Sequence, residues 1–192
     1  MENKKIIAIV GMPGSGKTDA GTFLRKKGFE FIRLGQLTLD EVKNRGLEPG
    51  EASERPIREE LRKKYGMAAF AILNSPKIDE MLKTNSVIVD GLYSWEEYLE
   101  FKKKYGEKLI VIAIYASPET RYKRLSARKW GKEKDAKMIN RSYTKEEAEN
   151  RDFAQLTNLH TGGPIAMADF TIVNEGSPED LFKQVDQIIS NS

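Results

Sequence analysis

The stretch IIAIVGMPGSGKT at residues 6–18 decides the fold, because it joins an apolar run to a glycine-rich loop. Its last eight residues match the pattern G-x-x-x-x-G-K-[ST] at Gly11, Gly16, Lys17 and Thr18. A loop that wraps a polyphosphate must turn its backbone N–H groups inward, which requires conformations open mainly to glycine. The pattern therefore predicts a buried strand, a phosphate-binding loop and the start of a helix.

We expect this loop to form a nucleotide site for ATP. The N-terminus of the following helix adds partial positive charge. Lys17 is expected to reach the β and γ phosphates, and the Thr18 hydroxyl to bind Mg²⁺. The residues assigned to the nucleotide in this loop are Gly11, Met12, Pro13, Gly14, Ser15, Gly16, Lys17 and Thr18.

The composition excludes several other classes of protein. With 32 basic and 29 acidic residues the net charge is +3, which is too balanced for a nucleic-acid binder. The chain has no cysteine, which excludes disulfides, thiolate catalysis and cysteine-bound zinc. The first apolar run is too short for a signal peptide, and no stretch approaches the roughly 18 apolar residues that span a membrane. We therefore expect a cytoplasmic protein without nucleic-acid or membrane partners.

Short apolar segments alternate with helical patterns along the chain. The expected strands are 6–10, 29–34, 86–90, 109–116 and 170–174. One expected helix follows the first strand and stops at Gly28, and the others cover 56–73, 95–105, 118–129 and 178–189. This alternation predicts an α/β fold in which helices flank a five-stranded parallel sheet.

Two regions, 35–80 and 128–168, are too long to be plain crossovers between strands. Both are rich in arginine and lysine. We interpret residues 1–192 as one domain in which these two regions are insertions that close over a ligand.

Several stretches together resemble nucleotide kinases such as adenylate kinase and dephospho-CoA kinase. The chain looks still more like an archaeal family of adenylate-kinase-related P-loop proteins, over nearly its whole length. The matching stretches are IIAIVGMPGSGKT, FEFIRLGQ, VIVDGL, IAIYASPETRYKRLSAR and ADFTIVNEGS. The resemblance implies a P-loop NTPase fold of the nucleoside-monophosphate-kinase type, with 35–80 as the acceptor-binding insertion and 128–168 as the lid.

The resemblance also implies roles for charged residues outside the loop. Asp90, at the end of an apolar strand, would face the phosphates and hold Mg²⁺ together with Thr18, although an aspartate before glycine is also common in turns. Arg124 and Arg128 are four residues apart, so they are expected to share a helix face, one near adenine and one at the phosphates. Phosphoryl transfer requires such charge because the migrating group is anionic. The alternative for both arginines is a solvated basic face.

The last part of the chain supplies further candidates by the same resemblance. Lids in this family carry arginines that swing onto the phosphates, and Arg151 is a better candidate than Arg141, although a helix salt bridge explains the same residue. The loop after the last strand usually passes the adenine ring in these kinases. Asn174 and Gly176 are therefore expected to offer backbone contacts to the nucleotide.

The acceptor side departs from the family pattern. Relatives usually have Gly-Asp after the second strand, where this chain has Gly35 followed by Gln36. The two arginines that hold the acceptor phosphate in adenylate kinases are matched here by Leu39 and Ser94. The remaining candidates for an acceptor site are Arg33, Gly35, Arg55, Arg58, Arg62 and Gly91.

The sequence favours a kinase that uses ATP and Mg²⁺ and transfers the γ-phosphoryl group to a nucleotide-like acceptor. The missing acceptor arginines leave open a regulatory module that binds ATP or AMP with little or no turnover. A hydroxyl kinase similar to dephospho-CoA kinase is the other alternative, although Gln36 cannot serve as its base. Asp40, four residues on, could replace that carboxylate.

Overall fold

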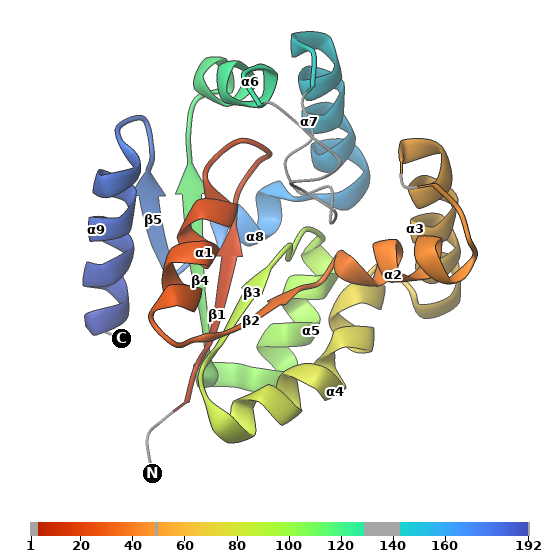
Figure 1. The fold of residues 1–192 in the computed structure, drawn as a ribbon. Helices are drawn as coiled ribbons and strands as arrows, with labels where there is room; N and C mark the ends of the chain where they lie inside the picture. The colour runs from red at the N-terminus through yellow and green to blue at the C-terminus, as the bar shows by residue number, and fades with distance from the viewer. Residues whose placement is uncertain (1–3, 49, 129–142, 192) are drawn as a thin grey trace.

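The computed structural model describes residues 4–48, 50–128 and 143–191. Within these residues five strands form one parallel sheet in the order β2-β3-β1-β4-β5 (Figure 1). The strands are β1 (Ile6–Val10), β2 (Glu30–Arg33), β3 (Val87–Asp90), β4 (Leu109–Tyr115) and β5 (Phe170–Val173). All five lie within the segments expected from the sequence, and the predicted α/β fold with a five-stranded parallel sheet is confirmed.

The central strand β1 explains why the sheet forms here. All five of its side chains are buried, and it pairs with β3 on one side and β4 on the other. A strand covered on both faces reads as a continuous apolar run, as IIAIV does. Because every strand is parallel, the carboxyl ends of the strands meet at one edge of the sheet, where the phosphate loop begins.

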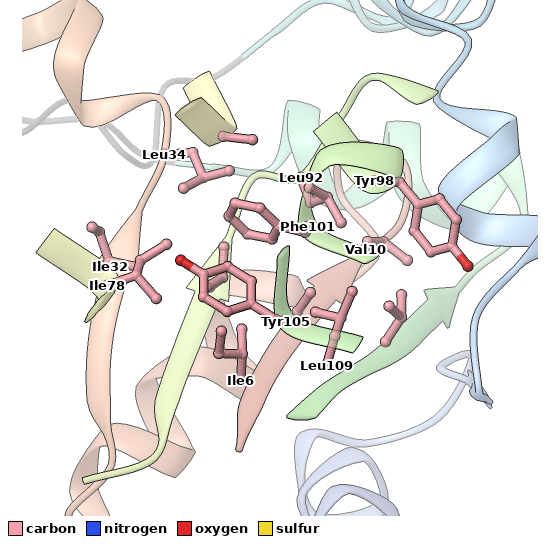
Figure 2. Close-up of a cluster of buried hydrophobic side chains, with 14 of the residues drawn as sticks. Ile6, Val10, Ile32, Leu34, Ile78, Leu92, Tyr98, Phe101, Tyr105 and Leu109 are labelled. Atoms are coloured by element: carbon pink, nitrogen blue, oxygen red, sulfur yellow. The ribbon is translucent and has the colours of Figure 1, made fainter. Parts of the chain in front are cut away.

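Helices cover both faces of the sheet (Figure 1). On one face α1 (Lys17–Lys26) and α9 (Pro178–Ser190) pack on a cluster of isoleucine side chains from β1 and β4. On the other face lie α4 (Ala69–Thr84), α5 (Trp95–Tyr105) and α8 (Gly162–Ala166). Figure 2 shows part of this second cluster, in which Phe101 and Leu92 pack over the alternate side chains of the strands. A short 3₁₀ turn, Gly106–Lys108, leads from α5 into β4.

The region 35–80 is helical, but its helices differ from the expected one. It contains α2 (Gln36–Asn44), α3 (Glu51–Tyr65) and most of α4. The expectation of one helix over 56–73 is wrong, because the chain breaks at Gly66, whose φ of 79° lies in the left-handed region. After the break, α4 packs on the same face of the sheet as α5, whereas α3 projects beyond β2 (Figure 1).

The second long region also consists of helices where it is described. After α6 (Pro118–Ser126) the description resumes at Tyr143, and α7 (Lys145–Leu159) begins with a capping box formed by Thr144 and Glu147. Helices α6 and α7 lie side by side above the carboxyl edge of the sheet (Figure 1). No helix in the described part of the chain is long and apolar enough to span a membrane.

Candidate functional site

The loop between β1 and α1 has the strand–loop–helix setting that a phosphate loop requires. Gly11, Gly14 and Gly16 have φ angles of 144°, 81° and 105°, which favour glycine over every other residue. Gly16 is also the N-cap of α1 in the left-handed conformation, with no side-chain cap. The backbone N–H groups at the start of α1 therefore remain available to an anion.

Two neighbouring segments hold this loop so closely that a side chain would not fit. A Cβ atom at Gly11 would lie 2.3 Å from the carbonyl oxygen of Ile114 at the end of β4. At Gly16 it would lie 2.3 Å from Nδ2 of Asn174. The glycines thus serve both the loop conformation and its packing against the strand ends.

Lys17 folds back onto its own loop. Its side chain is buried, and Nζ donates to the carbonyl oxygens of Gly11 at 2.7 Å and Met12 at 3.0 Å. Burial lowers the pKa of Lys17 to about 8, although the nearby Asp90 carboxylate acts to raise it. A buried ammonium group with only carbonyl partners is poised to take a stronger anionic partner, such as a phosphate.

A cavity of about 160 Å³ opens beside the loop and gathers four cationic side chains. Lys17, Arg33, Arg128 and Arg151 line it, against the two carboxylates of Asp19 and Asp90. They come from α1, from the end of β2, from the segment after α6 and from α7. Four positive groups around a small polar cavity favour a ligand with several negative charges.

Thr18 and Asp90 both line this cavity and fit the expected Mg²⁺ site. Asp90 ends β3 and is 3% exposed, and its Oδ1 has no hydrogen-bond partner within the described structure. A buried carboxylate oxygen without a partner is suited to a cation or to the water molecules of a cation. Residues 4–48, 50–128 and 143–191 contain no group of three or more metal-binding side chains, so phosphate oxygens would complete the coordination.

Arg33 lies beside Asp90 on the neighbouring strand. The two residues are register partners, and Arg33 Nε is 3.9 Å from Asp90 Oδ2. Arg33 Nη1 is buried, and none of the described residues accepts a hydrogen bond from it. Gly91, which follows Asp90, has a φ of 97°, and a Cβ there would lie 3.2 Å from the ring of Tyr93. The strand end therefore presents one arginine and one carboxylate to the cavity.

The structure separates Arg124 from Arg128. The expected shared helix face is wrong, because α6 ends at Ser126 and Arg128 lies beyond it. Arg128 lines the cavity, where burial lowers its pKa. Arg124 instead donates to the backbone oxygens of Asn174 at 2.9 Å and Gly176 at 3.4 Å. One arginine thus lines the cavity, and the other holds the loop after β5.

The loop after β5 is also tied to the phosphate loop by a side chain. Asn174 is 6% exposed, and its Nδ2 donates to the carbonyl oxygen of Ser15 at 2.8 Å. Glu175 accepts hydrogen bonds from Ser117 and Thr120 at the start of α6. Backbone contacts of Asn174 and Gly176 to the nucleotide stay a prediction, whereas the side-chain link from Asn174 to the phosphate loop is an additional contact that the structure shows.

Arg151 reaches the cavity from α7 in contact with an aromatic residue. Its guanidinium group lies 5.1 Å from the ring centre of Tyr143 and donates to the Tyr143 hydroxyl. Arg141, the weaker candidate, lies outside the described residues.

The other acceptor candidates lie apart from the cavity lining. Arg55 pairs with Glu59 within α3, and Arg58 pairs with Glu54. The guanidinium group of Arg62 lies 5.2 Å from the ring centre of Phe70, at the start of α4. Of the four candidate arginines, only Arg33 therefore belongs to the described residues that line the cavity.

The start of α2 also lies outside the lining. Gly35 is the N-cap of α2, and the Gln36 side chain donates to Asp40 Oδ1 at 3.0 Å on the exposed face of that helix. Asp40, the carboxylate that could take the place of the one missing at Gln36, is therefore hydrogen-bonded to Gln36 itself.

Sequence reasoning missed two tyrosines of the cavity, Tyr93 and Tyr143. Burial, reinforced by Asp90, raises the pKa of Tyr93, so its phenol stays protonated and can donate a hydrogen bond. A signal was available for both: Tyr93 follows the Asp90-Gly91 pair, and Tyr143 directly precedes the Thr144 capping box.

The fold of this chain is similar to that of several solved structures over almost the whole length of the chain. The structure of TT1252 from Thermus thermophilus has a TM-score of 0.64 at 20% identity, covering 98% of this chain and 97% of that one. Shikimate kinase from Acinetobacter baumannii has a TM-score of 0.57 at 20% identity, covering 99% and 95%. A gluconokinase from Sinorhizobium meliloti has a TM-score of 0.57 at 12% identity, covering 100% and 97%. At these identities the likeness shows the P-loop kinase fold alone.

Sequence relatives are closer. A family model described as "AAA domain" matches residues 7–153. A UPF0200 protein of Thermococcus kodakarensis is 36% identical over 191 residues, covering 96% of this chain and 98% of the relative. A UPF0200 protein of Methanocaldococcus jannaschii is 37% identical over 187 residues, covering 96% and 88%. The narrower assignment to adenylate-kinase relatives stays a prediction, whereas these matches show that the chain is a P-loop protein of the archaeal UPF0200 family.

Proposed function

We propose that this protein is an ATP- and Mg²⁺-dependent phosphotransferase that moves the γ-phosphoryl group to the phosphate of a small nucleotide-like acceptor. One observation carries the proposal: Lys17, Arg33, Arg128 and Arg151 line one cavity together with the phosphate loop and Asp90. These four cationic side chains come from four separate segments of the chain and line a single small cavity. Transfer requires them because the migrating group and its acceptor are both anionic.

On the donor side, the loop amides and the start of α1 bind the polyphosphate, and Lys17 exchanges its two carbonyl partners for phosphate oxygens. Arg128 and Arg151 contact the transferring group from the opposite wall. Arg124 fixes the 174–176 loop, beside which the base lies. Thr18 and Asp90 hold Mg²⁺, which neutralises charge on the phosphates.

On the acceptor side, strand order gives Arg33 its role. The edge of the sheet presents β2, β3 and β1 in sequence, so Asp90 lies between Arg33 and the phosphate loop. Adjacent strands are about 4.8 Å apart, so an anion on Arg33 lies within reach of a donor phosphate on the loop. When Asp90 serves the metal, the partly buried guanidinium group of Arg33, whose Nη1 is buried, requires another negative partner, which the acceptor phosphate supplies.

An acceptor that is already ionised needs no general base. Its phosphate oxygen attacks the γ-phosphorus, and the bond from that phosphorus to the β,γ-bridging oxygen breaks with its electron pair on ADP. The products carry the same total charge as the reactants, and no proton is released. The hydroxyl-kinase alternative requires a base, and the side chain at the expected position, Gln36, is bonded to Asp40 outside the lining.

We also propose that the helices of 35–80 bind the acceptor and that α7, within 128–168, acts as the lid. Helix α3 projects beyond β2, the strand that carries Arg33 (Figure 1). Helix α7 carries Arg151, which lines the cavity beside the loop. Closure of both regions would exclude water from the transferring group.

The test is product analysis with γ-labelled ATP, Mg²⁺ and a panel of nucleoside monophosphates and dephospho-CoA, for the wild-type protein and for Lys17→Ala. The proposal predicts a labelled diphosphate that the variant does not form. Tight ATP binding without product from any acceptor would favour the regulatory module. Label on dephospho-CoA alone would favour the hydroxyl kinase.

A further inference from the structure

The buried side chain of Arg121 connects three segments around the phosphate loop. It lies in α6 and is 4% exposed. Its Nε donates to the carbonyl oxygen of Ala116 after β4 at 3.0 Å, and its Nη1 donates to the carbonyl oxygen of Pro13 in the phosphate loop at 3.1 Å. Its Nη2 lies 2.6 Å from Asp152 Oδ2 on α7. One guanidinium group thus holds the end of a strand, the loop and the lid helix together.

Asp152 connects this group to the cavity through its neighbour in the chain. It is 5% exposed, and Oδ2 also accepts a hydrogen bond from the Tyr122 hydroxyl at 3.1 Å. The preceding residue is Arg151, which lines the cavity. Because both residues belong to one turn of α7, the attachment of Asp152 to α6 sets where Arg151 can lie.

The phosphate loop and α6 are also in direct contact. A Cβ atom at Gly14 would lie 2.8 Å from the backbone oxygen of Arg121. A shift of the loop at Pro13 or Gly14 would press on Arg121, and the Arg121–Asp152 ion pair would pass that movement to α7. Arg121 itself is not among the described residues that line the cavity, so any effect that it has on the ligand would pass through other residues.

We infer that Arg121 and Asp152 are a positioning pair that couples the phosphate loop to α7 and places Arg151 on the phosphates when ATP binds. The inference rests on the proposed function only in that Arg151 contacts the polyphosphate. A buried ion pair suits this task, because its charges are stabilised only in one close arrangement and separation leaves each unpaired in a low dielectric. Movement at one end is therefore transmitted to the other end.

A double-mutant cycle separates coupling from simple structural support. The variants are Asp152→Asn, Arg151→Ala and their combination, with the Kd of MgATP and the hydrogen exchange of α7 amides as readouts. We expect Asp152→Asn to raise the Kd about tenfold in the wild-type background and less than twofold in the Arg151→Ala background. MgATP should protect the amides of α7 in the wild-type protein and not in Asp152→Asn, while the phosphate loop stays protected in both.

Asp169→Asn is the matched control. Asp169 Oδ2 also accepts a hydrogen bond, from the Val111 N–H in β4 at 2.8 Å, but Asp169 does not line the cavity. It should leave the Kd and the protection of α7 unchanged. If Asp152→Asn does not fold, Tyr122→Phe, which removes only the hydroxyl bond to Asp152, takes its place in the cycle. Its effect should be about threefold and should also disappear in the Arg151→Ala background.

Equal effects of Asp152→Asn with and without Arg151, or normal protection of α7 in that variant, would overturn the inference and leave the proposed function standing. Failure of the wild-type protein to bind MgATP would overturn both. Binding and coupling without phosphoryl transfer would overturn the proposed function alone.

Discussion

Arg33 and Asp90 end neighbouring strands as register partners, and their charged groups approach to 3.9 Å between Nε and Oδ2. Neither side chain is fully satisfied by the other, since Arg33 Nη1 and Asp90 Oδ1 are both buried without partners in the part of the chain that is described. Arg33 Nη1 is therefore available to donate to an anion, and Asp90 Oδ1 is available to contact a cation. An acceptor phosphate that lies beside a metal ion would use both groups.

Removing the guanidinium group of Arg33 should weaken binding of the acceptor selectively. We expect Arg33→Gln to raise the KM of the acceptor roughly 10- to 100-fold, the range for a hydrogen bond to a charged group. The Kd of MgATP should change less than about threefold. Initial-rate kinetics and calorimetric titration measure the two quantities.

Arg55→Gln is the control for that variant, because Arg55 is exposed on α3, pairs with Glu59 and lies outside the cavity lining. Its effect on the acceptor KM should stay below about twofold. Equal losses in the two variants would contradict the specific role of Arg33 in holding the acceptor.

The sequence predicted the strands and the phosphate loop because both depend on local patterns. Each strand is a short apolar run with turn or charged residues at its ends, and the loop requires glycine at fixed spacing. The break between α3 and α4 was missed because apolar residues continue through it, and only Gly66 marks the turn. The clustering of Arg33 with Arg151 depends on long-range packing that no local pattern records.

Gly16→Ala should weaken the binding of MgATP without unfolding the domain. Alanine would have to adopt a φ of 105°, and its Cβ atom would lie 2.3 Å from Asn174 Nδ2. Strain of this kind costs about 1–3 kcal/mol, so the Kd of MgATP should rise by roughly 5- to 150-fold.

The matched control is Gly46→Ala, since Gly46 also has a positive φ, 66°, but has open space around the added Cβ. It should cost about 1 kcal/mol of stability and leave the Kd unchanged. If both variants bind MgATP equally well, the packing of Asn174 against the loop does not matter for the nucleotide.

The titration of Lys17 should appear in the stability of the ligand-free protein. Its pKa is about 8 in the folded state, where burial disfavours the charge, and about 10.5 in the unfolded chain. Between these values the unfolded state binds more protons, so this group makes the free energy of unfolding rise with pH over that window. Below pH 8 the folded protein bears the full cost, about 3 kcal/mol before its two carbonyl bonds are counted.

Urea unfolding of the wild-type protein and Lys17→Ala isolates this contribution from that of other titrating groups. The variant should be the more stable of the two at pH 7, and the difference should shrink as the pH is raised toward 10. A difference that does not depend on pH would refute the lowered pKa.

The two arginines around the end of α6 should have different kinetic effects. Arg128→Gln should lower kcat by roughly 10²- to 10³-fold, as the loss of a group that stabilises developing charge does. Arg124→Gln should mainly raise the KM of ATP, because Arg124 holds the carbonyls of Asn174 and Gly176 instead of lining the cavity. Steady-state kinetics with both variants test this, and the reverse pattern would mean that Arg124 moves to the phosphates in the closed state.

The central claim is that the γ-phosphoryl group passes to an acceptor that is already ionised. The most direct test counts ADP and protons together, in weakly buffered solution at pH 8.5, with ATP, Mg²⁺ and a mixture of nucleoside monophosphates. A phosphate monoester is fully ionised at this pH, because its second pKa is about 6. We predict that the wild-type protein forms ADP without releasing protons and that Lys17→Ala forms no ADP. One proton per ADP would contradict the claim, since both hydrolysis and transfer to a hydroxyl release one, and so would the absence of ADP.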